Sequence, residues 1–295
     1  MIYDGGFDLD LFRKLPETRV GQRQHNASVS DLGRLPDLVA ITLKKLDGRK
    51  MILKALIFDV DGTLAETEEV HLHVYNKIFK QAGLDWQWTR EKFIRLLSHA
   101  GAKEQMRAYS DEVGQGLSDT EISILHDQKM ASYEETLRAG GALSLRPGVH
   151  DLIRDARDND LKLGVATASH RKNVETLCQA CWGQQADQIF DGVATGDEVL
   201  SKKPSPEVYQ LALKRLGVSP ETTIAIEDSQ NGIRSAKVAG MRVLITPSEF
   251  SNLDDLSDGD WIVPSLERDD LPGVVLKSLG MRPALSYIER MLAGD

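Results

Sequence analysis

Short apolar runs alternate with amphipathic stretches along the chain from Leu53 onward. Intervals such as 148–159 and 206–217 repeat their apolar residues every three or four positions, which is typical of helices packed on one face. Between the helical intervals lie short runs rich in β-branched residues, as expected for buried parallel strands, at 53–61, 161–169, 188–196, 222–229 and 242–246. This alternation predicts an α/β fold with a doubly wound parallel sheet.

One long interval breaks the alternation. From 67 to 145 the apolar spacing is helical throughout, beginning with His71, Tyr75, Ile78, Phe79 and Ala82. Segments 83–88 and 112–119 are interpreted as its turns. We therefore expect an all-helical subdomain at 67–145, inserted after the first strand into an α/β core made of 51–66 and 146–280.

The two ends of the chain differ from this core. Residues 1–50 carry scattered Gly, Pro, Asn and Ser around one modestly apolar run, 35–46, which could form a short helix. They are interpreted as an N-terminal extension, either a flexible segment or the product of a start codon assigned too early, with Met51 as the true start; the second is preferred. Residues 281–295 are interpreted as a C-terminal tail, in which 284–295 could form a short helix and shows no residues with evident chemistry.

Composition narrows the classes of function. The net charge of −9 argues against a nucleic-acid partner, and it means that local lysines or a metal ion must attract any anionic substrate. No apolar run is long enough for a membrane span, and the acidic segment 1–10 does not resemble a signal peptide. The presence of only two cysteines suggests a reducing compartment, so a cytoplasmic location is expected. For the oligomeric state, a monomer is the default expectation. Cys178 and Cys181 follow helical spacing and are interpreted as packing residues rather than a redox or zinc site.

Polar residues gather where the predicted strands end. In a parallel sheet these carboxyl ends share one edge, so their side chains are expected to converge on one crevice. The residues concerned are an acid pair, a hydroxyl, a lysine and a second acid pair: Asp59, Asp61, Thr167, Lys203, Glu227 and Asp228. Carboxylates that face each other in this way need a cation between them, and an all-oxygen set suits Mg²⁺. Glu227 and Asp228 could equally cap the helix that follows them.

These residues resemble a known family. The D-x-D-G-T run that starts at Asp59, the strand-end Thr167, Lys203 before Pro-x-Pro, and the Glu227-Asp228 pair resemble, in order, the four motifs of haloacid dehalogenase-type (HAD-like) hydrolases. The place of the insert is similar to that in members with a helical C1 cap. The stretches "FDVDGTLAETEE", "GLDWQW", "KKPSPEVY" and "AIEDSQNG" resemble the CbbY-like branch, close to the β-phosphoglucomutases. The resemblance implies a Rossmann-like core with an all-helical cap.

The resemblance also implies roles for the catalytic groups. Asp59 is the expected nucleophile that attacks phosphorus, and Asp61 is the expected general acid and base. Thr167 would donate a hydrogen bond to the transferring phosphoryl group, and Lys203 would offset its charge. Lys202 is interpreted as a solvated neighbour, although an exchange of roles with Lys203 stays open.

A metal site follows from the same resemblance. Mg²⁺ would be held by the carboxylates of Asp59 and Asp228 and by the backbone carbonyl of Asp61, with Glu227 acting directly or through water. Gly62 would let the backbone approach the phosphate closely.

The substrate contacts expected from the cap begin at the hinge. Thr67 and His71 match a Thr/His pair that helps Asp61 exchange protons, although both could be ordinary helix residues. The loop "HAGAKEQM" resembles the substrate-reading G-G-K-E-R loop and keeps Lys103 and Glu104, but it has Gln105 in place of the arginine. This puts a preference for a bisphosphate in doubt.

Other polar residues near these motifs have less specific interpretations. Substrate contacts are also predicted after Thr167, or else a polar helix start, at Ala168, Ser169, Arg171 and Asn173. The acids Glu66, Glu68 and Glu69 are interpreted as hinge and first-turn residues that suit the helix dipole.

Three functions are compatible with this pattern. The leading hypothesis is a Mg²⁺-dependent phosphatase that acts on a small phosphorylated sugar or sugar bisphosphate through an aspartyl-phosphate. The alternative within enzymes is a phosphomutase like the β-phosphoglucomutases, since the same groups serve both reactions. A binding protein without turnover is a third possibility, against which the complete set of catalytic residues argues.

Overall fold

The computed structural model describes residues 52–99, 101–140, 143–251 and 254–281. The predicted helix at 35–46 and the interpretations of the extension 1–50 lie outside these residues, and so does the tail except for Met281. The domain boundaries stay a prediction.

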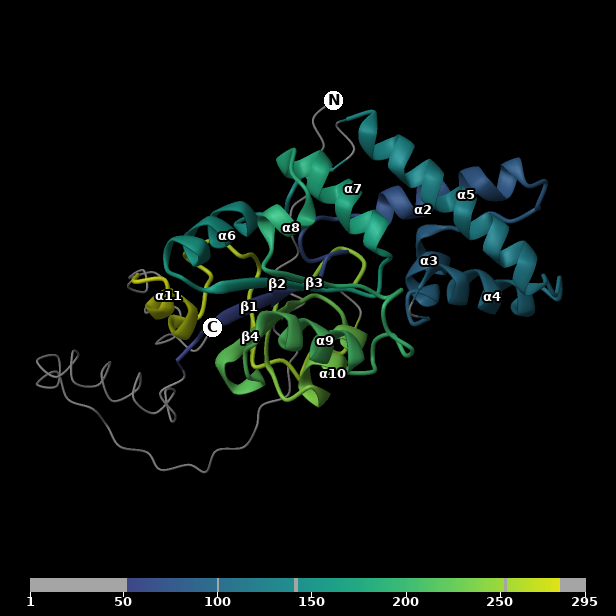
Figure 1. Cartoon of the computed structure of the whole chain (residues 1–295). Helices are drawn as coiled ribbons and strands as arrows, with labels where there is room; N and C mark the ends of the chain where they lie inside the picture. The colour runs from purple at the N-terminus through teal and green to yellow at the C-terminus, as the bar shows by residue number, and fades with distance from the viewer. Residues whose placement is uncertain (1–51, 100, 141–142, 252–253, 282–295) are drawn as a thin grey trace, which may run out of the picture. The chain divides into compact units, whose positions relative to one another are not determined.

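The core is built on a six-stranded sheet in the order β3-β2-β1-β4-β5-β6, with every neighbouring pair parallel. This confirms the predicted doubly wound α/β fold (Figure 1). Because the chain leaves β1 for β2 on one side and reaches β4 on the other, a crevice opens at the carboxyl end of β1. The strands are β1 Ala55–Phe58, β2 Lys162–Ala166, β3 Gly192–Ala194, β4 Thr223–Glu227, β5 Arg242–Ile245 and β6 Trp261–Ile262.

Two strand predictions need correction. The run 188–196 is not one strand, because its start belongs to a short helix, α8 Ala186–Ile189, and only Gly192–Ala194 pairs in the sheet. Gln185 and Gln188 cap this helix reciprocally, while Ile189 enters the core from a helical turn. The edge strand β6 was missed because two residues are too few to show a strand pattern.

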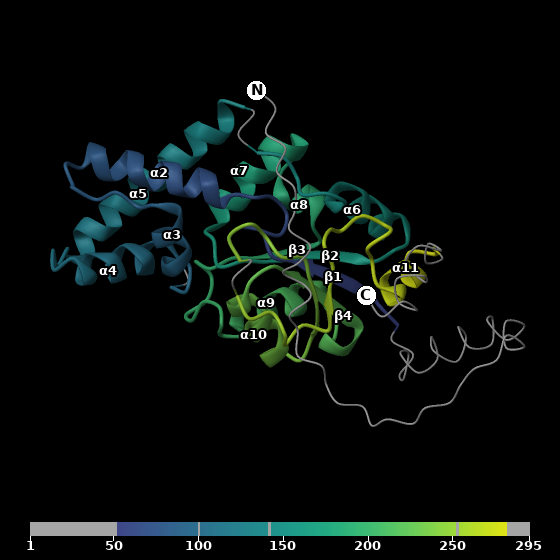
Figure 2. The same cartoon turned by 180° about the vertical axis from the view of Figure 1, so that it is seen from behind.

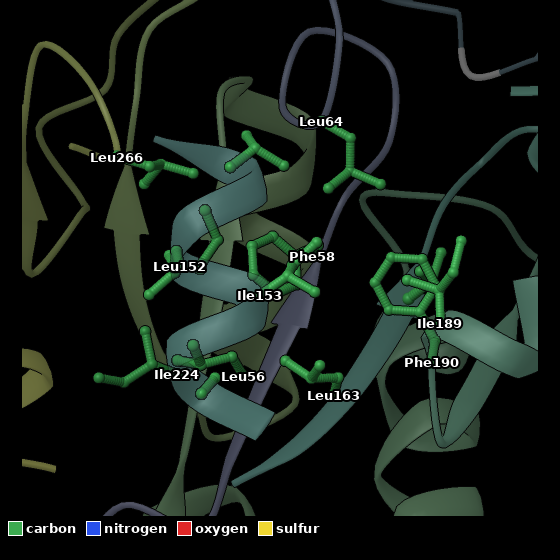
Figure 3. Packing of buried hydrophobic residues seen from close by; sticks show 14 of the residues in the cluster. Leu56, Phe58, Leu64, Leu152, Ile153, Leu163, Ile189, Phe190, Ile224 and Leu266 are labelled. Atoms are coloured by element: carbon green, nitrogen blue, oxygen red, sulfur yellow. The ribbon is translucent and has the colours of Figure 1, made fainter. Parts of the chain in front are cut away.

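Helices cover both faces of the sheet. Alternate residues of β1 point to opposite faces, so Leu56 and Phe58 join one hydrophobic cluster and Ile57 joins another. Figure 3 shows Leu152 and Ile153 of helix α6 (Val149–Asp158) packed among residues of the first cluster. Figures 1 and 2 show α6 and α8 on one side of the sheet and α9 (Glu207–Leu216) and α10 (Gln230–Val238) on the other. The remaining helices of the core are α6 Val149–Asp158, α7 Arg171–Trp182, α9 Glu207–Leu216, the 3₁₀ turn η3 Pro220–Thr222, α10 Gln230–Val238 and α11 Gly273–Ser278.

The interval between β1 and β2 is helical, as predicted, and has its own aromatic core. Tyr75, Phe79, Trp88 and Phe93 pack together there, with ring centroids 4.5–6.0 Å apart. Ala82 lies just past the first helix and is exposed, so the buried apolar face ends at Phe79 and does not include it. The four helices are α2 Glu68–Gln81, α3 Arg90–Leu96, α4 Ala102–Glu112 and α5 Asp119–Arg138.

The interpretation of the cysteines is compatible with their places on α7, where Cys178 is buried and Cys181 is partly buried. Among the described helices, none combines the length and the apolar character needed to cross a bilayer.

Gly148 provides a test of how the chain returns from the insert to the sheet. It precedes α6 with a φ of +82°, and a Cβ there would lie 2.0 Å from the carbonyl carbon of Leu266. Gly148→Ala is therefore expected to lower the free energy of unfolding by about 3 kcal/mol or more, measured by urea denaturation.

The matched control is Gly183→Ala. Gly183 has a φ of +65°, but no heavy atom outside its immediate neighbours lies within 4 Å of the added Cβ. Only backbone strain of about 1 kcal/mol is expected there. Equal losses in the two variants would contradict the close packing of 148 against 266.

Candidate active site

The two acid pairs lie side by side because β1 and β4 pair in register. Phe58 lies opposite Ile226, and the backbone N–H of Asp59 donates to the Ile226 carbonyl at 2.9 Å. The next residues on the two strands are thus Asp59 and Glu227, followed by Asp61 and Asp228. Asp59, Glu227 and Asp228 are all buried, the last two by at least 97%.

Lys203 joins these strand ends from the segment that follows β3. Its Nζ donates to Asp59 Oδ1 at 2.6 Å and to Glu227 Oε1 at 2.5 Å. Tyr209 donates its hydroxyl to the same Glu227 oxygen at 2.6 Å. Lys203 is only 5% exposed, so its ammonium exchanges water for two carboxylates.

The charges around Lys203 do not balance. Burial lowers the pKa of Lys203, but the charges of Asp59 and Glu227 outweigh this and raise it, so the ammonium stays protonated. Burial also raises the pKa of Asp59, and the neighbouring carboxylates raise it further against the effect of Lys203. Burial and the charge of Glu227 raise the pKa of Asp228 to about 7, although Ser248 donates a hydrogen bond to it. One ammonium therefore lies among three buried carboxyl groups, and a further cation would reduce the repulsion between their negative charges.

The same three carboxylates fit a metal ion. Asp59, Glu227 and Asp228 each offer an oxygen, and these oxygens lie within 4.8 Å of one another. Gly62, with a φ of +78°, passes close beside them, since a Cβ there would lie 2.3 Å from Asp228 Oδ2. Hard divalent cations such as Mg²⁺ prefer oxygen ligands of this kind.

Asp61 has a different environment from Asp59. Its Oδ1 accepts a hydrogen bond from Thr67 Oγ1 at 2.5 Å and lies 3.2 Å from His71 Nε2, while its Oδ2 accepts from the Ser169 hydroxyl. Burial raises the pKa of Asp61, but the contacts with His71, Ser169 and Thr67 together lower it well below its ordinary value.

His71 acts on Asp61 through a hydrogen bond rather than a charge. Burial and the nearby charge of Lys129 lower the pKa of His71, so the imidazole is neutral at pH 7. A neutral ring with its proton on Nε2 donates to the Asp61 carboxylate. The two carboxylates of the D-x-D motif thus differ, with Asp59 held by an ammonium and Asp61 by neutral donors.

A cavity of about 760 Å³ opens onto these groups. Its walls come from both the core and the helical insert, and most of the predicted site residues belong to them. The predicted residues in the lining are Asp59, Asp61, His71, Lys103, Thr167, Ala168, Ser169, Asn173, Lys203 and Asp228. The Thr167 hydroxyl accepts the backbone N–H of Ser169 at 3.1 Å, so it shapes the loop that holds Ser169 against Asp61.

Other predicted contacts lie outside this lining. Arg171 forms ion pairs with Glu175 and Asp187, each at 2.8 Å. These ion pairs do not support its predicted role as a substrate contact. Glu104 is paired with Lys202, whose Nζ lies 2.9 Å from both of its carboxylate oxygens. Lys202 thus links the core to α4 and does not exchange roles with Lys203. Gly62, Thr67 and Glu227 do not line the cavity, but they lie against Asp228, Asp61 and Lys203, which do.

Two lining residues carry charges that the sequence interpretation did not assign to the site. Glu68, the first residue of α2, is 5% exposed. Lys129 of α5 is 3% exposed, and its Nζ lies 5.3 and 5.5 Å from the ring centroids of Tyr75 and Tyr133. Burial lowers the pKa of Lys129 to about 8, against the opposing charge of Asp61. Lys129 lies four residues after Leu125 and four before Tyr133, on the apolar face of the helix. A lysine at such a position is the sequence feature that could have predicted its burial.

Comparisons with known proteins agree with this geometry. Residues 56–246 match the family model of the haloacid dehalogenase-like hydrolases. Protein CbbY of Rhodobacter capsulatus is 48% identical over 216 residues, which cover 73% of this chain and 95% of that protein. The phosphorylated carbohydrates phosphatase of Thermotoga maritima is 29% identical over 64% of this chain and 82% of its own.

A solved structure extends the likeness to the fold. CbbY of Rhodobacter sphaeroides, crystallised as a point mutant with xylulose-(1,5)bisphosphate, superposes with a TM-score of 0.69 at 39% identity. The match covers 74% of this chain and 96% of that structure. The chain therefore belongs to the haloacid dehalogenase-like hydrolases.

Replacing Lys129 tests whether the site keeps a charge at the expense of stability. No carboxylate forms an ion pair with Lys129 in the described part of the chain, and the charge of Asp61 offsets the burial of its ammonium only in part. Lys129→Met is expected to raise the free energy of unfolding at pH 7 by about 1–3 kcal/mol in urea denaturation.

The pH dependence gives this prediction a sign. The folded-state pKa of Lys129, about 8, lies below its ordinary value of 10.5, so the unfolded chain binds more protons between these pH values. Wild-type stability from this group rises with pH across that window, and the advantage of Lys129→Met should shrink from pH 8 to 10. The exposed control Lys80→Met should change stability by less than about 0.5 kcal/mol. A destabilised Lys129→Met would contradict the argument.

Proposed function

We propose that this chain is a Mg²⁺-dependent phosphatase that hydrolyses a small phosphorylated sugar or sugar bisphosphate through a phosphorylated Asp59. The observation that carries the proposal is the buried group of Asp59, Glu227 and Asp228 around Lys203, opposite an Asp61 held by three separate donors. One carboxylate is thus placed for attack and the other for proton transfer, on the same cavity.

In the first half-reaction, a carboxylate oxygen of Asp59 attacks the phosphorus atom and the bond to the sugar oxygen breaks. Asp61, in its protonated form, gives its proton to that leaving oxygen, which departs as the sugar hydroxyl. A bound phosphate dianion beside Asp61 favours the protonated form, because a nearby negative charge raises the pKa of a carboxyl group. Lys203 keeps Asp59 oriented and offsets the charge that builds up on the phosphoryl oxygens.

In the second half-reaction, the Asp61 carboxylate takes a proton from a water molecule, whose oxygen attacks the phosphorus of phospho-Asp59. Inorganic phosphate leaves, Asp59 is restored and Asp61 is again protonated. Thr67, His71 and Ser169 hold Asp61 in place for both transfers.

Mg²⁺ would be held by Asp59, Asp228 and the Asp61 backbone carbonyl, with Glu227 direct or through water. When bound, it would neutralise phosphoryl oxygens and reduce the repulsion between Asp59 and an anionic substrate. The charge excess described above supports this assignment.

The substrate class is supported by the cavity lining and by the relatives. Besides acidic residues, the lining contains basic groups, which could bind a second anionic group of a substrate: His99, Lys103, His126, Lys129 and His170. Gln105, which stands in place of the arginine of similar loops, is buried and accepts a hydrogen bond from Tyr75 at 2.7 Å. The complex of CbbY with xylulose-(1,5)bisphosphate and the carbohydrate phosphatase of Thermotoga maritima support a phosphorylated sugar.

Asp59→Asn tests the proposed nucleophile. Release of inorganic phosphate from a panel of sugar phosphates and bisphosphates is expected to fall about 10³-fold or more, because an amide does not attack phosphorus as a carboxylate does. The control is Asp85→Asn, at an exposed position between α2 and α3, which should keep wild-type activity.

Two further measurements accompany this assay, a test of folding and an analysis of the products. Circular dichroism should show that Asp59→Asn is folded, so that a lost activity reports chemistry. The products should contain phosphate and free sugar but no isomeric sugar phosphate, since isomer formation would instead support the phosphomutase. Phosphatase activity that survives Asp59→Asn would overturn the mechanism.

A further inference from the structure

Glu68 is buried, although an acid in the first turn of a helix can interact with the helix dipole while exposed. It begins α2 directly after Thr67, yet its side chain is turned into the protein and lines the cavity with only 5% exposure. Its Oε2 is buried and has no hydrogen-bond partner among the residues that the structure describes. The neighbouring Glu69 occupies the same first turn but is exposed and pairs with Arg90 at 3.1 Å. The helix dipole accounts for an acid here, but not for its burial.

The Glu68 carboxylate lies on the side of the site that carries Asp228. Glu68 Oε1 is 2.8 Å, and Asp228 Oδ2 is 2.3 Å, from the position that a Cβ would take on Gly62. Gly62 thus leaves room in which both carboxylates approach one point. The oxygens of Glu68 do not belong to the group formed by Asp59, Glu227 and Asp228 within 4.8 Å. Glu68 is therefore adjacent to the candidate metal ligands without being one of them.

The charges near Glu68 leave it unsatisfied. The charged neighbours that act on it are the acids Asp228, Asp61 and Glu66. The guanidinium of Arg146, which pairs with the neighbouring acid Glu66, also donates to backbone carbonyls of residues 62, 246 and 247. A buried carboxylate oxygen without a partner is unfavourable, so a group that binds there is expected to supply a hydrogen-bond donor to Oε2.

We propose that Glu68 is an outer ligand of the metal ion, accepting hydrogen bonds from water that the ion carries. The inference rests on the metal site of the proposed function. Mg²⁺ is reluctant to lose its water and keeps several molecules of it in protein sites, and those molecules need acceptors. Glu68 supplies a carboxylate whose Oε1 lies near Asp228 Oδ2 at Gly62, and it comes from the first turn of the insert. It thereby couples the position of α2 to the occupied metal site.

Direct Mg²⁺ binding tests this role without relying on turnover. The metal-free full chain is titrated with MgCl₂ by isothermal titration calorimetry, comparing wild type with Glu68→Gln and Glu69→Gln. The Gln amide keeps the size of Glu68 but replaces one acceptor by a donor. Glu68→Gln should weaken Mg²⁺ binding about 10–100-fold, as the loss of an outer partner does in other metal sites, while Glu69→Gln should stay within about twofold of wild type.

Thermal unfolding separates this role from damage to the fold. In EDTA, Glu68→Gln should melt no lower than wild type, because burial and the neighbouring acids disfavour a charged carboxylate at this position. On addition of Mg²⁺ its melting temperature should rise less than that of wild type, because it binds the ion more weakly. A Glu68→Gln variant that melts lower in EDTA and binds Mg²⁺ as tightly as wild type would show a structural role and overturn the proposal.

Asp228→Asn distinguishes this inference from the metal site on which it rests. If Asp228→Asn weakens Mg²⁺ binding and Glu68→Gln binds within about threefold of wild type, the role of Glu68 is wrong and the metal site stands. If wild type binds no Mg²⁺, both the metal site and the role of Glu68 are wrong. Weakening in both variants, with Glu69→Gln unchanged, supports the proposal.

Discussion

The buried ammonium of Lys203 is the interaction on which the site depends. It donates hydrogen bonds to Asp59, directly after β1, and to Glu227, at the end of β4, two strands that are far apart in the sequence. Its positive charge reduces the cost of burying these two carboxylates. The remaining negative charge, centred on Asp228, would favour the binding of a further cation at this candidate metal site. Without Lys203, the acids at the centre of the parallel sheet would lose their internal counter-charge, and the strand ends could not be packed so closely.

The helical insert is tied to the chemistry through its first turn. Within six residues of the chain, Thr67 and His71 hydrogen-bond to Asp61 and Glu68 lies beside Asp228. The orientation of Asp61, the proposed proton-transfer group, therefore depends on where α2 lies. At the other end of the cavity, the ion pair between Lys202 and Glu104 joins the core to α4. The insert thus contributes to the acid pairs and also shapes the wall that faces the substrate.

Strand ends were the part of this molecule that sequence reasoning predicted well. Acids that follow apolar runs, as Asp59 and Asp228 do, have few structural explanations, and the strand order brings them together without further information. Contacts between distant segments were harder to predict. The pairing of Glu104 with Lys202 depends on how α4 lies on the core, and Glu68 looks like any first-turn acid until its burial is known. Short elements such as β6 and α8 depend on tertiary packing more than on local pattern.

The central claim, that Asp59 becomes phosphorylated, is tested most directly in an Asp61→Asn variant given an aryl phosphate. An aryl oxide leaves without protonation, so attack by Asp59 should proceed, whereas water lacks its base and phospho-Asp59 should accumulate. We expect a burst of one aryl alcohol per enzyme molecule and, after acid quenching and digestion, one phosphoryl group on the peptide that contains Asp59. Turnover without a burst and with no phosphorylated Asp59 would contradict the mechanism.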